Sequence, residues 1–290
     1  MKSALFPDIE TRTYVMGIIN LTPDSFSGDG LMGEGNLLEK ALAQALRFVE
    51  EGVDVLDLGA ESTRPGHSPI TSDEELERLL PVIRLLRKEL PDALISVDTY
   101  RAETAAHVLE EGVQIINDIW GFKHDPKMAE VVAKHAATAI LMHNRKAGSA
   151  QLNPELGGHI AEVYYDNLLE DIKNDLRDSI CLAKAAGLPD ENIILDPGIG
   201  FAKTIAQSLY TLRHLDELKD FGYPLLLGVS RKGSIGHTLK LPREERLEGS
   251  LAANAYGILH GANLVRVHDV KATVRLARML DAIRFAEDIE

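Results

Sequence analysis

Polar residues stand at the ends of several short apolar runs, where their side chains could bind a ligand. The residues that end these runs, or flank the last residue of one, are Asn20, Asp98, Asn117, Asp196, Arg266 and His268. A buried amide or carboxylate is costly unless it is hydrogen-bonded, so their repeated placement indicates a common purpose. We therefore predict that these side chains share one rim.

A second set of residues lies shortly after the ends of apolar runs. These residues are basic and could hold a small anion. The set consists of Arg64, Lys203, Arg231, Lys232 and Arg266. Scattered surface charge is the alternative for any one of them alone. Lys203 and Thr204 follow Ala202 rather than glycine, so the spacing of a nucleotide-binding phosphate loop is not met.

The segment from Gly17 to Ser27 joins a run end to a loop with hydroxyls and a carboxylate. Asn20 ends the run, and Pro23 then directs the chain into the loop that contains Asp24. Oxygen ligands of this kind suit Mg²⁺, which takes few protein ligands and keeps water and phosphate around it. Taken alone, the segment could instead form an Asx-Pro turn.

Eight runs rich in Val, Ile and Leu are typical of the strands that would position these residues. They lie near Tyr14 to Ile19, Val53 to Leu58, Ala93 to Val97, Gln114 to Asn117, Thr138 to Met142, Asn192 to Leu195, Pro224 to Val229 and Asn263 to Val267. Runs without apolar and polar alternation indicate parallel strands that are covered on both faces. Segments such as residues 37–49 lie between them and carry the apolar spacing of helices.

Capping boxes mark several helix starts, since two side chains in such a box satisfy unpaired backbone donors. The pairs that fit are Ser72 with Glu75, Thr204 with Gln207 and, more weakly, Asn36 with Glu39.

Strands alternate with helices from end to end without a linker, which predicts one α/β domain over residues 1–290. About eight such units are what a single-domain (β/α)8 TIM barrel needs. A doubly wound open sheet is the alternative, in which only strand ends at the switch point meet. The barrel accounts better for the predicted rim, because all of its strand ends converge on one face.

Composition narrows the classes of function and partner. The net charge of −14 argues against a general nucleic-acid surface. The single cysteine, Cys181, excludes an internal disulfide, and we expect it to be buried in a helix. No stretch approaches the length of a membrane span, and Met1 to Tyr14 lacks the apolar centre of a secretory signal. We therefore expect a cytoplasmic protein with small-molecule partners and neither nucleic acid nor membrane among them.

Eight motifs, in order along nearly the whole chain, resemble those of the dihydropteroate synthases. They are Gly17 to Ser27, Asp57 to Gly66, Ser96 to Thr99, Ile116 to Ile119, Leu141 to His143, Asp196 to Phe201, Gly228 to Lys232 and Val265 to Asp269. The resemblance implies a (β/α)8 barrel that condenses 6-hydroxymethyl-7,8-dihydropterin diphosphate with 4-aminobenzoate. The products would be 7,8-dihydropteroate and diphosphate, in folate biosynthesis, and the enzyme would be a sulfonamide target.

The resemblance implies a set of residues that bind the pterin: Asp98, Asn117, Met142, Asp196, Gly228 and Lys232. A pterin presents adjacent N–H donors along one edge, and one carboxylate can accept both in parallel. Asp196 is the candidate for that edge. Asp98 and Asn117 would bind the opposite side of the ring system.

The same resemblance implies diphosphate-binding residues, with Mg²⁺ held at the first of them: Asn20, Thr63, Arg64, Arg266 and His268. Arg266 and His268 are two residues apart, so both point the same way in an extended segment. Diphosphate is a good leaving group once its charge is neutralised. We therefore expect a dissociative displacement that needs no activated nucleophile.

The resemblance also implies a pocket for 4-aminobenzoate, formed by Phe26, Pro65, Phe201, Ser230, Arg231 and Lys232. The turn that begins at Ser230 opens a helix, and its backbone N–H groups could bind the carboxylate. Two positions depart from the family pattern. Gly233 replaces a serine that is common after the lysine, and Asp29 lies one position later than the acid of the first loop, so its contact with a metal is only a candidate.

Two other functions fit parts of this pattern. A corrinoid-linked methyltransferase also binds a pterin in a barrel, but it has no use for the anion elements at Thr63 and Arg64 and at 230–232. A non-catalytic pterin-binding paralogue is a second alternative, and the intact set of site residues argues against it. The family further implies a homodimer formed through the late helices.

Overall fold

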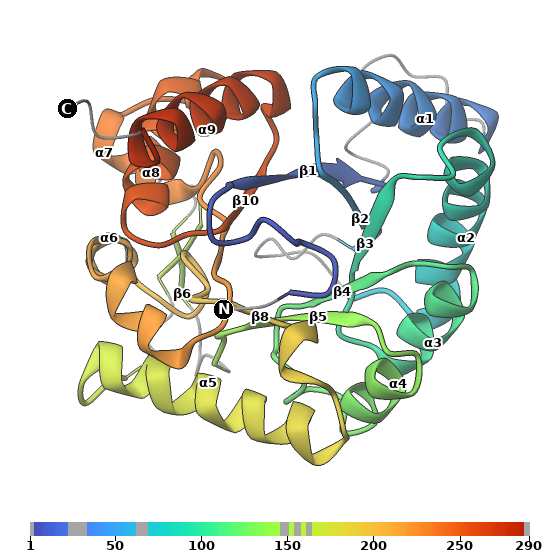
Figure 1. The fold of residues 1–290 in the computed structure, drawn as a ribbon, viewed down its shortest axis with the longest axis horizontal. Coiled ribbons are helices and arrows are strands. Elements are labelled where there is room, and N and C mark those ends of the chain that lie inside the picture. The colour runs from blue at the N-terminus through green and yellow to red at the C-terminus, as the bar shows by residue number, and fades with distance from the viewer. Residues whose placement is uncertain are drawn as a thin grey trace.

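Eight parallel strands form the central sheet of the computed structural model, which describes residues 3–22, 34–61, 69–145, 151–153, 158–160 and 164–286 (Figure 1). The strands are β1 (Tyr14–Asn20), β2 (Val55–Gly59), β3 (Leu94–Asp98), β4 (Ile115–Asp118), β5 (Thr138–Met142), β8 (Ile193–Asp196), β9 (Leu226–Leu227) and β10 (Leu264–Val267). They are ordered β8-β5-β4-β3-β2-β1-β10-β9 in the sheet.

A parallel bridge between Leu195 and Leu225 joins the two outer strands of this order. The backbone N–H of Leu195 also donates to the carbonyl of Pro224 at 2.9 Å. The sheet therefore closes into a barrel. The (β/α)8 prediction is confirmed, and the open-sheet alternative is wrong.

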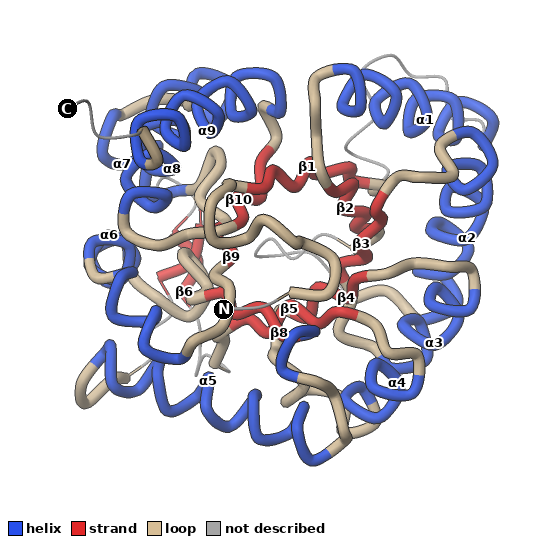
Figure 2. Tube along the Cα trace, viewed as in Figure 1, coloured by secondary structure: helices blue, strands red, loops and turns tan. Residues whose placement is uncertain are grey.

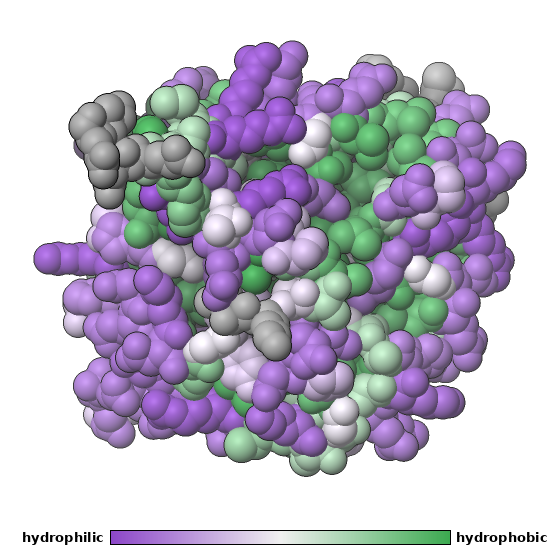
Figure 3. Space-filling model, viewed as in Figure 1, coloured by the Kyte–Doolittle hydropathy of each residue, from purple (hydrophilic) through white to green (hydrophobic). Residues whose placement is uncertain are grey.

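Helices surround the barrel (Figure 2). They are α1 (Glu34–Glu50), α2 (Ser72–Glu89), α3 (Ala102–Glu110), α4 (Met128–Lys134), α5 (Leu168–Ala185), α6 (Ile205–Arg213), α7 (Gly233–Leu239), α8 (Leu247–Leu259) and α9 (Val270–Arg284), with short 3-10 turns η3 (Asp190–Asn192), η4 (Leu215–Phe221) and η5 (Arg243–Glu245). The helix α2 is amphipathic and buries Leu79, Ile83 and Leu86 against the barrel. In Figure 3, hydrophilic side chains lie over the outer helices and hydrophobic ones show between them.

The barrel interior is apolar toward the amino ends of the strands. Met16, Val55 and Leu264 pack there, together with Phe6 and Ile9 of the N-terminal segment. That segment crosses the barrel opening in Figure 1. Because alternate residues of a strand face the same side, the inward positions nearer the carboxyl ends are left to the polar residues.

The capping box of α2 lies one residue before the predicted one. Thr71 accepts from the backbone N–H of Glu74, and the Glu74 side chain accepts from the backbone N–H of Thr71. The prediction of Ser72 with Glu75 is therefore wrong. Glu75 is buried instead, where its carboxylate accepts from the Thr104 hydroxyl at 2.6 Å.

The capping box of Thr204 and Gln207 at the start of α6 is confirmed. The weaker box of Asn36 and Glu39 is wrong, because α1 already begins at Glu34. A helix start cannot lie inside a helix.

Three further details differ from the sequence expectations. The predicted strand from Pro224 to Val229 pairs over Leu226–Leu227. A short antiparallel pair, β6 (Gln151–Asn153) and β7 (Gly158–Ile160), follows β5 in a segment where no strand was predicted. Cys181 is exposed rather than buried, because it lies beside the buried face of α5 and not on it.

Among the helices of the described residues, none combines the length and the apolar character needed to cross a membrane.

Candidate active site

The carboxyl ends of neighbouring strands bring the predicted polar residues to one end of the barrel. Asn20 is paired in register with Gly59, Gly59 with Asp98, and Asp98 with Asn117. Gly59 lies between the two side chains, since an added Cβ there would be in ordinary contact with both, 3.9 Å from Asn20 Oδ1 and 3.8 Å from Asp98 Cβ. The predicted rim therefore exists on the strands β1, β3 and β4.

A group of three charged residues crosses the interior at this end, with Asp57 fully buried and Asp98 and Arg266 half-buried. Arg266 donates from Nε to Asp57 Oδ2 at 2.7 Å and from Nη2 to Asp98 Oδ2 at 2.8 Å. Burial lowers the pKa of Arg266, but the charges of Asp57 and Asp98 outweigh this and raise it above its usual value. Arg266 is therefore a permanent cation that ties β10 to β2 and β3.

Asp98 can change its protonation state near neutral pH. Burial raises its pKa to about 7, and the negative charge of Asp57 adds to this effect, whereas Arg266 opposes it. A carboxylate that shares one arginine with a second carboxylate is only partly compensated. Asp98 is thus ready to release or accept a proton when a charged ligand binds beside it.

Asp196 and Lys232 are two further charged residues, and each influences the pKa of the other. Asp196 Oδ1 accepts from the backbone N–H of Gly198 at 2.7 Å. Burial raises the pKa of Asp196, and the positive charge of Lys232 opposes the increase. Burial lowers the pKa of Lys232 to about 8, and Asp196 opposes that decrease. Lys232 Nζ also donates to the carbonyl of Ile199, so it lies against the loop that follows β8.

Three more of the predicted residues lie around this pair. Met142 is paired in register with Asp196 and is buried. Gly228 lies beside Lys232, since an added Cβ would be in ordinary contact with Nζ at 3.9 Å. The ring of Phe201 lies beside the same ammonium group, whose Nζ is 4.8 Å from the ring centroid.

Several buried acceptors in the interior have no hydrogen-bond partner among the described residues. They are Asn117 Oδ1, Asp57 Oδ1 and Ser96 Oγ. Ser96 and Asp57 are partners in register, one layer below the rim. A buried polar atom without a partner is costly, so these atoms indicate donors that water or a ligand supplies.

His268 is held as a neutral ring in one orientation. Arg243 Nη2 lies 3.2 Å from His268 Nε2, and arginine can only donate, so Nε2 accepts. The proton must then be on Nδ1, which donates to Ser230 Oγ at 3.0 Å. Burial lowers the pKa of His268 to about 3, and the charges of Arg243, Arg266 and Arg231 add to the effect.

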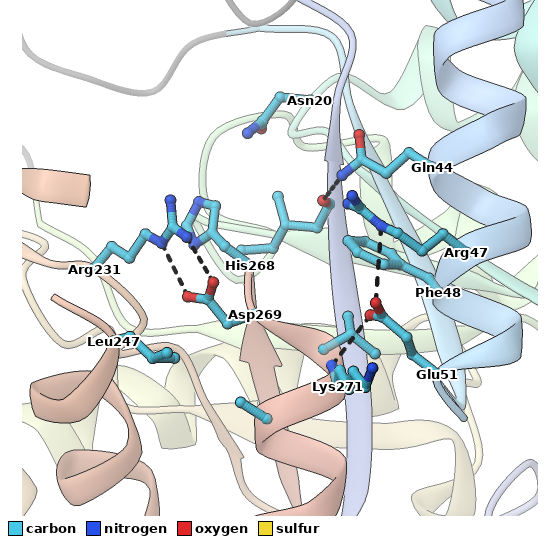
Figure 4. A pocket seen from close by; sticks show the side chains of 13 residues that line it. Asn20, Gln44, Arg47, Phe48, Glu51, Arg231, Leu247, His268, Asp269 and Lys271 are labelled. Carbon is cyan, nitrogen blue, oxygen red and sulfur yellow. Dashed lines mark hydrogen bonds and ion pairs between the residues drawn. The ribbon is translucent and has the colours of Figure 1, made fainter. Parts of the chain in front are cut away.

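A cavity of about 460 Å³ opens beside His268 and Asn20, between α1 and the start of α9 (Figure 4). Arg231 reaches toward it and binds Asp269 through two hydrogen bonds of 2.9 and 2.6 Å. The Arg231 backbone N–H donates to Ser250 Oγ at 2.9 Å, which fixes the turn before α7. The guanidinium and the turn are thus both held by the fold.

The structure adds two residues that the sequence reasoning missed. Asp57 lies two positions before Gly59, so alternation along β2 turns it inward. That spacing was a usable signal. Arg243 comes from the turn η5 between α7 and α8, and no strand-end pattern points to it.

Some predicted site residues lie outside the residues that the structure describes. They are Phe26, Asp29, Thr63, Arg64 and Pro65.

Comparisons with known proteins agree with this geometry. The family of pterin binding enzymes matches residues 16–268. A dihydropteroate synthase of Clostridium beijerinckii is 47% identical over 277 residues, which cover 95% of this chain and 96% of the relative.

Two solved structures are similar over nearly their whole length. A dihydropteroate synthase of Clostridium difficile, solved in the presence of pteroic acid, has a TM-score of 0.85 at 46% identity and covers 94% of this chain and 97% of its own. A Xanthomonas albilineans dihydropteroate synthase with 4-aminobenzoic acid has a TM-score of 0.85 at 37% identity, with coverage of 96% and 95%.

A closed (β/α)8 barrel with acids, an amide and lysine at its mouth, matched by this family, defines a pterin-binding barrel enzyme. The chain belongs to the dihydropteroate synthases, which are transferases of folate biosynthesis.

Replacing Asp98 by Asn should change how stability depends on pH. The folded pKa of Asp98, about 7, lies above the ordinary value of 3.8, so the folded state holds this proton more tightly. This group therefore makes the wild type less stable as pH rises from about 4 to about 7. We expect the free energy of unfolding of Asp98→Asn, relative to wild type, to be higher at pH 8 than at pH 5, by up to about 3 kcal/mol. Urea unfolding of both proteins at pH 5 and pH 8 measures this difference in the free energy of unfolding. The same difference at the two pH values would contradict the raised pKa.

Proposed function

We propose that this chain condenses 6-hydroxymethyl-7,8-dihydropterin diphosphate with 4-aminobenzoate through the residues gathered at the barrel mouth. The observation that carries the residue assignments is a set of acceptors at the ends of β3, β4 and β8: the half-buried Asp98 and the buried Asn117 and Asp196. Asn117 Oδ1 has no partner among the described residues, as expected of an acceptor that receives a donor from the substrate.

The pterin lies between the two acids in this proposal. Asp196 accepts from the adjacent N–H donors of one ring edge, which suits a carboxylate fixed by the Gly198 N–H. Asp98 and Asn117 bind the opposite side. Met142, Gly228 and Lys232 form the walls, and their positions beside Asp196 support that assignment.

The diphosphate binds next to Arg266 and His268. The hydrogen bonds of Arg266 within the described residues use Nε and Nη2, so Nη1 is the donor we assign to the anion. The neutral His268 orders the site while arginines supply the charge. Thr63 and Arg64 complete the set in this proposal, although they lie outside the described residues.

Mg²⁺ fits beside Asn20 by the chemistry of the donor set. Mg²⁺ binds hard oxygen ligands and usually takes one or two from the protein, with water and phosphate completing the octahedron. The amide oxygen of Asn20 lies at the end of β1, beside the cavity that His268 also lines. When bound, the ion would neutralise charge that grows on the diphosphate as it leaves.

The 4-aminobenzoate pocket lies on the other side of Lys232. Phe201 would stack near the aromatic ring, and the turn from Ser230 through Arg231 and Lys232 would hold the carboxylate. The packing of Phe201 against the Lys232 ammonium supports this assignment. Phe26 and Pro65 belong to the same pocket in the proposal and lie outside the described residues.

Catalysis then consists of positioning and electrostatics. The pterin acids and Asn117 orient the methylene that carries the diphosphate, and Arg266 stabilises the leaving group as its bond breaks. The amine of 4-aminobenzoate attacks the same carbon and loses a proton afterward. No side chain needs to act as a nucleophile.

Replacing Asp196 by Asn should lower kcat/KM for the pterin diphosphate by on the order of 100-fold. Charge-assisted hydrogen bonds contribute about 1.5–3 kcal/mol each, and the amide can accept only one of the two parallel donors. Steady-state formation of 7,8-dihydropteroate measures the change, with the exposed Asp190→Asn as a control. A value within threefold of wild type would contradict the pterin assignment.

The wild type in the same assay tests the function itself. Diphosphate should be released in step with product and only when 4-aminobenzoate is present. A methyltransferase or a non-catalytic paralogue would release none.

Replacing Asn20 by Ala should weaken the Mg²⁺-dependent binding of inorganic diphosphate by about tenfold, since one direct ligand is lost. Isothermal titration calorimetry of inorganic diphosphate, with Mg²⁺ and with EDTA, separates the loss of a metal contact from a general loss of diphosphate binding. In EDTA, Asn20→Ala should bind diphosphate as tightly as wild type. Gln44 lines the same cavity, and Gln44→Ala should bind diphosphate as tightly as wild type both with Mg²⁺ and with EDTA. Equal losses with and without Mg²⁺ would refute a metal contact at Asn20.

The protein is also proposed to be a cytoplasmic homodimer that pairs through its late helices. Exposed apolar side chains gather there, with Tyr256 and Leu259 on one face of α8 and Met279 and Ile283 on one face of α9. The last two are 61% and 58% exposed, and α8 packs against α9. Contiguous exposed apolar surface of this kind is typical of protein interfaces.

Sedimentation velocity should show a dimer for the wild type. Met279→Glu with Ile283→Glu should shift it to a monomer, because two charges would be buried in the interface. Leu46→Glu, an exposed apolar position on α1, should stay dimeric. A monomeric wild type would disprove the proposal.

A further inference from the structure

Lys203 is a buried cation that the proposed reaction does not use. Its side chain is 3% exposed, although lysine is a residue that is almost never fully buried without partners. Nζ lies 2.7 Å from His143 Nδ1, 3.1 Å from the carbonyl of Gly198 and 3.3 Å from the carbonyl of Phe201. Three acceptors therefore face the three donors of one ammonium group.

His143 continues this chain of hydrogen bonds to α5. Because Nδ1 accepts from Lys203, the ring proton is on Nε2, which donates to Asp175 Oδ2 at 3.0 Å. Asp175 also accepts from Arg145 Nε at 2.5 Å. Burial lowers the pKa of His143 to about 3, and Lys203 adds to this, so the ring stays neutral and accepts. Lys203 is thereby fixed to a helix of the outer layer.

The loop that Lys203 holds has an unfavourable backbone. Gly198, Gly200 and Ala202 have φ values of 67°, 80° and 48°, and the left-handed region is costly for alanine. Gly198 is also packed tightly against the residue that follows β5, since an added Cβ would lie 2.0 Å from the carbonyl oxygen of His143. Such conformations persist where surrounding contacts over-determine them.

Two lysines donate hydrogen bonds to carbonyls of this loop. Lys203 binds the carbonyls of Gly198 and Phe201, and Lys232 binds the carbonyl of Ile199 between them. The loop in turn places the Phe201 ring beside Lys232 Nζ. The position of Phe201 in the site thus depends on contacts made beneath the loop.

A direct role for Lys203 in anion binding does not fit this geometry. All three donors of Nζ point at acceptors of the protein, and the side chain is closed off from solvent. The sequence placed Lys203 among basic residues that could hold a small anion, and the structure turns it away from the mouth.

We propose that Lys203, fixed by His143 and Asp175, is a positioning residue that sets Phe201 and the Ile199 carbonyl for the binding of 4-aminobenzoate. The proposal rests on the assignment of Phe201 and Lys232 to the 4-aminobenzoate pocket. The strand β8, which carries Asp196, is paired with β5 independently of Lys203, so we expect loss of Lys203 to affect 4-aminobenzoate more than the pterin diphosphate.

Lys203→Met tests this, because methionine keeps the length of the stem and removes all three donors. We expect KM for 4-aminobenzoate to rise about tenfold, with KM for the pterin diphosphate and kcat within threefold of wild type. Lys123→Met is the matched control, since Lys123 contacts the Asp175 carbonyl from the surface without touching the loop, and it should leave all three values unchanged. Equal KM values for Lys203→Met and wild type, or equal increases for both substrates, would overturn the proposal.

Two variants at His143 keep the test decisive even if Lys203→Met does not fold. His143→Asn retains an oxygen acceptor near the place of Nδ1, whereas His143→Leu retains none. The Asn variant should keep KM for 4-aminobenzoate within threefold of wild type, and the Leu variant should raise it about tenfold. The same KM in both variants would overturn the proposal.

Phe201→Leu tests the assignment of Phe201 to the 4-aminobenzoate pocket separately from the positioning role of Lys203. A raised KM for 4-aminobenzoate in Phe201→Leu supports the pocket, and the Lys203 and His143 variants then decide the positioning role. An unchanged KM in Phe201→Leu overturns the pocket assignment and the inference with it, while turnover by the wild type still establishes the reaction.

Discussion

One arginine shared by two carboxylates organises the working end of this barrel. Arg266 on β10 reaches Asp57 on β2 and Asp98 on β3, so strands that lie on either side of β1 are joined through the interior. Each buried ion loses hydration worth several kcal/mol, and close partners with good geometry offset that loss. The three groups carry one excess negative charge when all are ionised, and the pKa of about 7 at Asp98 allows a proton to remove it. The mouth can therefore change its charge as an anionic substrate arrives.

Positive charge is concentrated locally in a chain that is acidic as a whole. The net charge is −14, yet three arginines act on His268: burial lowers the pKa of this ring, and the charges of Arg243, Arg266 and Arg231 lower it further. A histidine in this setting cannot serve as a cation at neutral pH. Its contribution is a fixed dipole, ordered by Ser230 and Arg243, while guanidinium groups that never titrate supply the charge. The affinity of the site for an anion is then insensitive to the usual titration of histidine.

The rim could be predicted from the sequence because the same signal, a polar residue at the end of an apolar run, recurs at several strands of the barrel. Each apolar run ends where a parallel strand meets the barrel mouth, so Asn20, Asp98, Asn117 and Asp196 could be located without knowing which strands are neighbours. Other features depend on contacts between distant segments. Arg243 comes from a connection with no pattern of its own, and its role follows only from the nearby His268. The capping box of α2 shifted by one residue because Thr71 and Ser72 both suit an N-cap, and burial of Glu75 against Thr104 decided between them.

Lys203 and Lys232 show most clearly why residue type and spacing do not fix a role. Both follow strand ends, Lys203 is buried and Lys232 is half-buried, and the loss of solvent around each ammonium group lowers its pKa. Lys232 faces Asp196 and the ring of Phe201, whereas three protein acceptors take up every donor of Lys203. The difference arises from Ala202, whose left-handed backbone turns the next side chain beneath the loop instead of into the mouth. Lys203 therefore supports Lys232 and is not a second anion-binding lysine. The carbonyls of Gly198 and Phe201, which Lys203 fixes, flank the Ile199 carbonyl that Lys232 binds.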